Sequence, residues 1–129
     1  MAPVLEEGQG ALGESPMPAA QWPALQEVLG TELLATLVGI SASSVQWYLA
    51  DARATPDAVA LRLHFLALVV SDLAGAYNDI GVRRWFGRAR KRLGGSSSAQ
   101  LLDGGWWPDD DGPNRVRELA ASLADSPVT

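Results

Sequence analysis

The chain has 129 residues, of which 47% are apolar, so it is long enough to build one domain with a buried core. Its 15 acidic residues outnumber its 10 Lys and Arg residues, and the net charge of −5 argues against a generic binder of polyanions. The absence of Cys and the single His exclude disulfide frameworks, thiolate zinc sites and metal motifs that need two histidines.

The first segment, residues 1–20, contains six Pro and Gly residues without a sustained periodicity. We therefore expect a flexible N-terminal arm, with ordering on a partner as the alternative. No basic region followed by an apolar stretch is present at this end, and the longest strongly apolar run, residues 65–70, is too short for a membrane helix. We expect a soluble, cytoplasmic protein.

Residues 21–55 are predicted to form a helix-turn-helix region. An apolar face at helical spacing ends at Gly30. Thr31 is the predicted N-cap of a second helix that breaks at Gly39, and Ser41 is the predicted N-cap of a third. Two short helices across a turn that contains glycine are the outline of a helix-turn-helix unit.

Residues 56–78 are predicted to form a long connecting or dimerisation helix. Thr55 is the expected N-cap and Pro56 the first helical residue, and the helix is expected to span residues 57–77. This segment is apolar on nearly every side. Such a helix is buried all round, either in a core or in a subunit interface.

The last part, residues 79–129, is predicted to contain three more helices. Asn78 opens the first, the Gly- and Ser-rich run at 94–98 caps a short helix at 99–103, and Pro113 lies near the start of the last. We find no strand-like alternation and no internal repeat in the chain. The predicted fold class is therefore all-α.

Catalysis has little support in the sequence. His64 lies on an apolar helix without Ser or Asp at useful spacing, so we interpret it as structural. The acidic run at residues 109–111 could bind a divalent cation, but it lacks the alternating ligands of a calcium site, and a solvated cap before the last helix is favoured. We expect no catalytic residue, no metal and no cofactor, and the protein is not expected to be an enzyme.

The third helix carries the candidate DNA-binding residues. Ser and Gln in its first turns can hydrogen-bond base edges in a major groove, but the helix has no Lys or Arg. Both DNA reading and ordinary helix capping therefore stay open. The candidate residues are Ser41, Ser43, Ser44, Gln46, Trp47 and Arg53.

A basic run at residues 83–92 holds six of the ten cations and no acid, with Trp85 and Phe86 between them. Basic residues beside aromatic ones suit either phosphate contacts or an acidic protein surface. A second aromatic feature is the pair Trp106 and Trp107 in a loop rich in Gly and Pro. Because tryptophans anchor interfaces, we expect Trp85 in the core and one member of the loop pair exposed or at an interface.

The second half of the chain carries these features in an ordered pattern. A Trp is followed eight positions later by a Leu and then by a Gly pair, a small helix ending in Leu-Leu-x-Gly, and a final amphipathic helix. In this order the chain is similar to the Xre/MbcA/ParS-like antitoxins, which neutralise RES-domain toxins, and the resemblance covers residues 25–124. The residues that carry it are Trp85, Leu93, Gly94, Gly95, Leu101, Leu102, Gly104, Val116, Leu119 and Leu123.

The chain departs from the family pattern at several positions. Ala89 and Ser98 stand where the family has Pro, and the basic residues at 90–92 replace a bland turn. Only a short tail, residues 125–129, follows the last helix, and it lacks the usual closing Gly. This tail is a place where family members can reach toward the pocket of the toxin.

The resemblance implies an N-terminal helix-turn-helix bundle joined by a long apolar helix to a small helical toxin-binding domain at 79–129. It also implies a type II antitoxin that occludes the active site of an NAD-degrading RES-domain toxin, with repression of its own operon at operator DNA and a homodimer within a larger complex. The alternative is a helix-turn-helix transcriptional regulator without a toxin partner. The candidate toxin-binding residues are Trp85, Arg88, Arg90, Lys91, Arg92, Leu102, Trp106, Trp107, Arg115, Leu119 and Leu123.

Overall fold

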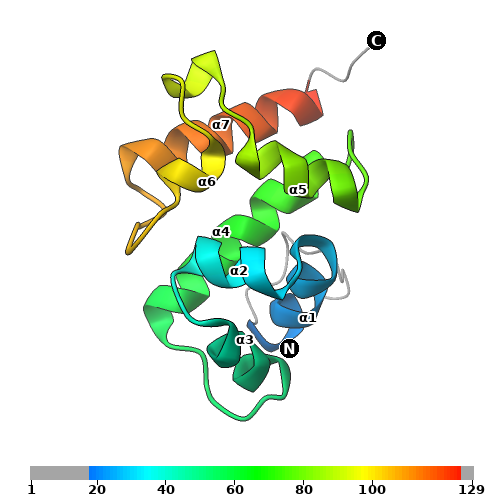
Figure 1. The fold of residues 1–129 in the computed structure, drawn as a ribbon, viewed down its shortest axis with the longest axis vertical. Helices are drawn as coiled ribbons and strands as arrows, with labels where there is room; N and C mark the ends of the chain where they lie inside the picture. Colours follow the sequence, from blue (N-terminus) through cyan, green and yellow to red (C-terminus); the bar gives the residue numbers. More distant parts are fainter. Residues whose placement is uncertain (1–17, 126–129) are drawn as a thin grey trace, which may run out of the picture.

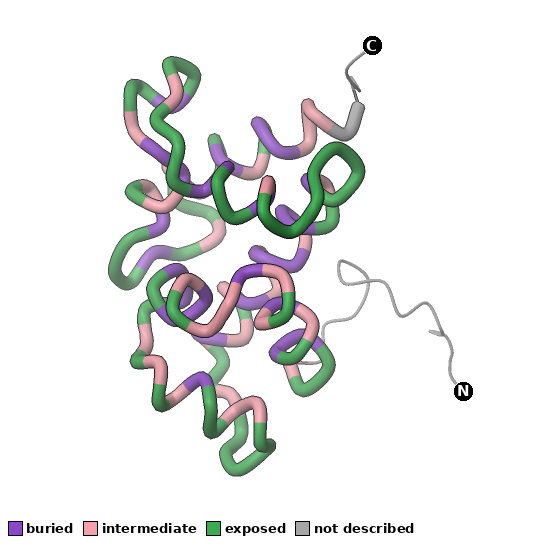
Figure 2. The backbone as a smooth tube through the Cα atoms, turned by 45° about the vertical axis from the view of Figure 1, so that its right-hand side comes forward, coloured by how far each residue is buried: buried purple, intermediate pink, exposed green. Residues whose placement is uncertain are grey.

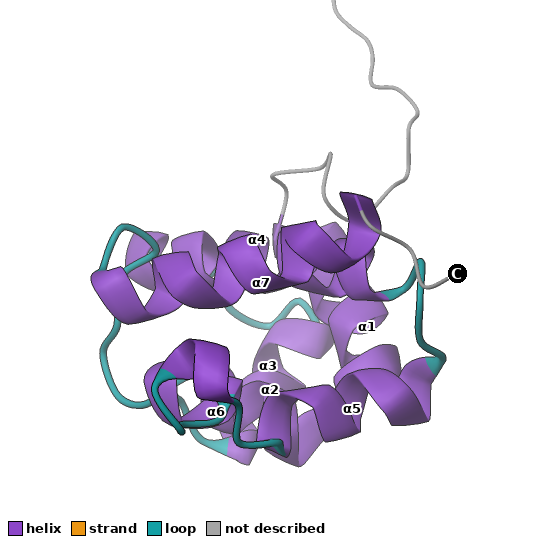
Figure 3. Ribbon diagram, turned by 90° about the horizontal axis from the view of Figure 1, so that it is seen from above, coloured by secondary structure: helices purple, strands orange, loops and turns teal. Residues whose placement is uncertain are grey.

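The computed structural model describes residues 18–125, which form α-helices, one short 3-10 helix and no strand (Figures 1 and 3). This confirms the predicted all-α class. Among these residues, no helix has both the length and the apolar character needed to cross a membrane. The elements are α1 (Pro18–Leu29), α2 (Thr31–Val38), α3 (Ala42–Leu49), α4 (Asp57–Leu73), α5 (Asp79–Gly87), η3 (Lys91–Leu93), α6 (Ser98–Leu101) and α7 (Asp111–Asp125).

The predicted C-terminal boundary of the N-terminal arm, residue 20, is wrong. Residues 18–20 belong to α1, which runs from Pro18 to Leu29 and buries Trp22, Leu25 and Leu29. The rest of the predicted arm, residues 1–17, lies outside the described residues, as does the tail at 126–129.

Helix α4 is the central element of the fold. It packs against α1 and α7, and Figures 1 and 3 show α7 running beside it. In Figure 1, α1, α2 and α3 gather at one end of the molecule, and α5, α6 and α7 lie at the other. The C-terminal helices are thereby held against the N-terminal ones through α4 and through a direct contact between α1 and α5.

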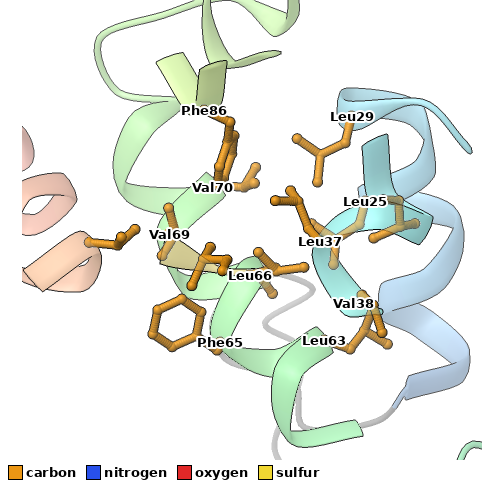
Figure 4. Packing of buried hydrophobic residues seen from close by; sticks show 14 of the residues in the cluster. Leu25, Leu29, Leu37, Val38, Leu63, Phe65, Leu66, Val69, Val70 and Phe86 are labelled. Carbon is orange, nitrogen blue, oxygen red and sulfur yellow. The ribbon is translucent and has the colours of Figure 1, made fainter. Parts of the chain in front are cut away.

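One hydrophobic cluster joins these helices. Figure 4 shows Leu66 of α4 facing Leu37 of α2, while Phe86 of α5 lies against Val70 of α4. Many of the buried positions in Figure 2 lie where helices face one another. The predicted apolar helix therefore places most of its apolar surface inside the chain. Leu61, with 50% of its surface exposed, is the large apolar side chain of α4 that remains open.

The end of α4 comes earlier than predicted. The helix stops at Leu73 rather than at residue 77, because the chain tightens into a turn there. The backbone N–H groups of Ala76 and Tyr77 both donate to the Leu73 carbonyl, at 2.9 Å each. This turn reverses the chain into α5.

Three predicted caps are confirmed. Ser41 accepts a hydrogen bond from the Ser44 backbone N–H at 3.0 Å, and Asn78 accepts one from Gly81 at 2.8 Å. In the Gly- and Ser-rich run, Ser97 is the N-cap of α6 and forms a reciprocal capping box with its partner at the third helical position. The helix itself, Ser98–Leu101, begins one residue earlier and ends two residues earlier than predicted.

Two predicted caps are wrong. Thr31 is already helical, and Gly30, with φ 83°, occupies the N-cap position of α2 without a side-chain cap. Pro56, not Thr55, is the N-cap residue of α4. The Thr55 hydroxyl instead accepts a hydrogen bond from the indole N–H of Trp22 at 2.9 Å. The Thr55 hydroxyl therefore binds a side chain that is distant in the sequence instead of capping the helix that follows it.

Candidate functional site

The local pattern of α5 exposes its arginines. Val82, Trp85 and Phe86 are buried at i, i+3 and i+4, so this face of the helix turns toward the core. Arg83 and Arg84 then turn to solvent, and the chain continues through more basic residues into η3. We call Arg84, Arg88, Arg90, Lys91 and Arg92 the C-terminal basic surface.

The C-terminal basic surface has no carboxylate partner within the described residues. The two salt bridges in this part of the chain join Arg115 to Asp111 and Arg117 to Asp72, outside the surface. The neighbouring Arg83 is engaged differently, because its Nε donates to the Val28 carbonyl at 2.8 Å. Positive charge is therefore concentrated at this surface without carboxylate partners from residues 18–125, although the chain as a whole has a net charge of −5.

Arg90 is the least exposed cation of this surface. Its guanidinium lies over the Trp85 ring, 5.0 Å from the ring centroid, in a cation–π arrangement. Burial lowers the pKa of the Arg90 guanidinium from its ordinary value, and the positive charge of Arg88 lowers it further, while Tyr77 opposes the change. The Arg90 guanidinium is thus partly removed from water without a neighbouring anion among the described residues to compensate its charge, which is energetically unfavourable.

The two loop tryptophans have different roles. Trp106 is buried, donates from its indole N–H to the Leu37 carbonyl at 2.8 Å, and meets the Phe65 ring edge-on at 4.9 Å. Trp107 has 47% of its surface exposed, and the Arg62 guanidinium lies 5.6 Å from its ring centroid. With Trp85 also buried, the expectation of a core Trp85 and one exposed loop tryptophan is confirmed.

The predicted toxin-binding residues fall into two groups. Trp85, Leu102, Trp106 and Leu119 are buried in the core and Leu123 is half-buried, so the core packing uses the side chains that were predicted to contact a toxin. The candidates whose side chains are exposed are Trp107, Arg115 and the exposed cations of the C-terminal basic surface.

The predicted DNA-binding residues lie on α3, at its N-cap Ser41 and in the loop after it at Arg53, and Figure 1 places α3 at the end of the molecule away from α5 and α6. Ser43, Gln46 and Trp47 are exposed at i, i+3 and i+4, on one face. Arg53 stacks on the Trp47 ring at 3.8 Å. The remaining two candidates, Ser41 and Ser44, are joined to each other by the cap of α3 and by a contact between their hydroxyls at 2.9 Å.

The other polar candidates are held by structural contacts. The His64 Nδ1 lies 3.0 Å from Nε2 of the buried Gln21, which agrees with a structural role. In the acidic run, Asp110 accepts a hydrogen bond from the Trp107 backbone N–H at 2.8 Å, and Asp111 pairs with Arg115. Within residues 18–125, no group of three or more His, Cys, Asp or Glu side chains could hold a metal ion.

The geometry thus separates two surfaces of different chemistry. The C-terminal one is cationic and unpaired, beside a core that contains Trp85, and the α3 face is polar with a single cation, Arg53, stacked on it. Comparisons of this chain with protein-family models, curated proteins and solved structures find no match.

Proposed function

We propose that the protein is a cytoplasmic antitoxin, an interaction protein that binds a RES-domain toxin and blocks access to the NAD-degrading active site. The observation that carries this proposal is the C-terminal basic surface, whose five cations have no carboxylate partner among the described residues. The proposal also draws on the resemblance of residues 25–124 to Xre/MbcA/ParS-like antitoxins.

Physical chemistry favours an acidic protein as the partner of this surface. Unpaired cations steer an oppositely charged partner and set the orientation of the complex, while an exposed aromatic side chain such as Trp107 supplies buried area. Inhibition by occlusion requires no catalytic group and no cofactor of its own. We therefore assign direct contact to Trp107, Arg115 and the exposed basic residues.

The resemblance also implies a homodimer within a larger toxin–antitoxin complex. Most of the apolar surface of α4 is used against α1 and α7, so a dimer contact on α4 would be centred on Leu61 rather than on the whole helix. This changes the expected dimerisation surface from a buried helix to a small exposed patch.

The test is co-purification of the full chain with a RES-domain protein encoded by the adjacent gene. We expect a stable complex, and we expect Arg92→Glu to weaken it about tenfold because the substitution places a negative charge in the complementary surface. Arg53→Glu is the matched control, since it makes the same charge change on the loop after α3. Two well-folded proteins that fail to associate would refute the proposal.

A second candidate function, operator binding, is favoured by one observation. Ser43, Gln46 and Trp47 form an exposed face on the second of two helices joined across Gly39, with Arg53 beside them. Under this alternative, Gln46→Ala weakens binding to the promoter DNA of the protein in a mobility-shift assay and leaves toxin capture unchanged. Absence of any shift by the unmodified chain would eliminate it.

A further inference from the structure

A small cavity lies where the turn after α4, helix α5 and the segment before η3 meet. It has a volume of about 210 Å³ and is lined by Tyr77, Gly81, Arg84, Trp85, Arg88 and Arg90. Gly81 allows this wall to close, because a Cβ there would lie 3.0 Å from the Tyr77 Cβ. The volume accommodates several water molecules of ~30 Å³ each, so a small polar ligand with part of its hydration shell fits.

The charge of the cavity is entirely positive. Three of its six lining residues are arginines and none is acidic. Arg84, Arg88 and Arg90 form no salt bridge with any residue that the structure describes. Like charges that line one small cavity repel one another, so this arrangement is stabilised when an anion enters.

Two of the lining residues carry a buried donor that has no acceptor among the described residues. The Trp85 indole N–H and the Arg90 Nε–H are both buried and make no hydrogen bond within residues 18–125. Buried donors are almost always paired in folded proteins, because an unpaired one loses its hydration without compensation. A cluster of cations, together with two lining residues whose donors have no acceptor in the described part of the chain, points to an acceptor-rich ligand.

We propose that this cavity binds a dianionic phosphate group. A carboxylate offers two oxygens and one charge, whereas a terminal phosphate offers three acceptor oxygens and about two charges, which matches three guanidinium groups and an indole N–H more fully. The planar guanidinium is the side chain that recognises phosphate oxygens in bidentate geometry. This inference does not depend on a toxin partner, because every group involved belongs to the chain itself.

The source of the phosphate is a small molecule rather than a nucleic-acid backbone. A backbone phosphodiester carries one charge and occurs in a row, whereas this cavity is a single position that is partly open to solvent. The candidate DNA-reading residues of α3 lie at the other end of the molecule (Figure 1). Free phosphate and a phosphomonoester share the required chemistry, and the two are separated by comparing inorganic phosphate with glycerol 3-phosphate.

The experiment is an NMR titration of the full chain labelled with ¹⁵N, which reports on the indole N–H groups of its five tryptophans. Trp85→Phe keeps an aromatic ring in the core and deletes one cross-peak, and this identifies the Trp85 signal. We expect inorganic phosphate to shift that signal in a saturable manner, while sodium chloride at equal ionic strength does not. No saturable shift, or the same shift with chloride, overturns the proposal.

Substitutions then test the cations individually. Arg84→Gln and Arg88→Gln are each expected to weaken phosphate binding about tenfold, the loss typical of a hydrogen bond between charged groups. Arg83→Gln is the matched control, because it removes the same charge from the same helix without lining the cavity, and we expect less than a twofold effect. Equal weakening by all three variants would show that phosphate responds to the overall positive charge of this region, and it would overturn the proposal of a specific site.

Two further ligands decide the chemistry. Acetate that binds as tightly as phosphate would refute a phosphate site in favour of a carboxylate site. Dimethyl phosphate that binds as tightly would refute a terminal phosphate in favour of a nucleic-acid backbone. We expect both to bind more weakly than inorganic phosphate, because each carries only one negative charge.

Discussion

Replacing each loop tryptophan by Ala tests whether adjacent indoles have different structural roles. Trp106 lies in the core and ties the loop after α6 to α2 through its hydrogen bond to the Leu37 carbonyl. Its own carbonyl also accepts a hydrogen bond from Arg62 Nε at 2.7 Å. Trp107 is half exposed and contacts Arg62 only across its ring.

The expected magnitudes differ several-fold. Truncating a buried Trp to Ala typically costs about 3–5 kcal/mol, a range that includes the carbonyl of Leu37 left without its donor, so we expect Trp106→Ala to lower the free energy of unfolding by about 4 kcal/mol. Trp107→Ala removes an exposed ring and a cation–π contact worth about 0.5–1 kcal/mol, so we expect a loss below ~1 kcal/mol. Trp106→Phe separates the hydrogen bond from the packing and should cost about 1–2 kcal/mol.

The assay is urea denaturation followed by the helical circular dichroism signal. With an m-value of about 2 kcal/mol/M, a loss of about 4 kcal/mol lowers the urea midpoint by about 2 M, and a loss below ~1 kcal/mol lowers it by less than ~0.5 M. Equal midpoints for Trp106→Ala and Trp107→Ala, or a larger decrease for the second, would refute the assignment of one indole to the core and the other to the surface.

Three further substitutions test local features of the fold by the same denaturation assay. Gly39→Ala should cost at least about 2 kcal/mol, because φ is +86° and the new Cβ would lie 3.0 Å from the Gly104 carbonyl oxygen. The control Gly94→Ala, with φ +70° and open space around the glycine, should cost only about 1 kcal/mol. Equal losses in the two variants would contradict the contact between Gly39 and Gly104. Thr55→Val should cost about 1 kcal/mol by leaving the buried indole N–H of α1 unpaired, and an unchanged midpoint would argue against that hydrogen bond. Ser97→Ala should cost about 1 kcal/mol by removing the capping box of α6, and a loss no larger than that of an exposed Ser43→Ala would contradict it.

The helices could be predicted from the sequence because their signals are local. Apolar spacing and the caps at Ser41 and Asn78 lie within a few residues of the helices that they specify. The predictions at Thr31 and Thr55 failed because they used only local capping rules. In the folded chain, Thr55 meets an indole 33 positions away, and no nearby residue indicates that contact.

The candidate site was predictable only in part. The basic run and the exposed loop tryptophan are visible in the sequence, but the burial of Trp106 depends on Leu37, which lies 69 positions away. The cavity proposed to bind an anion is lined by Tyr77, in the turn after α4, together with Arg84 and Arg90. The missing acceptors of its buried donors become apparent only when the side chains are placed in three dimensions.

We propose above that the C-terminal basic surface closes off a toxin's active site. The most direct measurement is NAD degradation by the RES-domain protein encoded by the adjacent gene, titrated with the full chain. We expect inhibition to be complete near a fixed stoichiometric ratio, and we expect Arg92→Glu but not Arg53→Glu to abolish it. NAD degradation that continues unchanged at a large excess of the folded chain would contradict it.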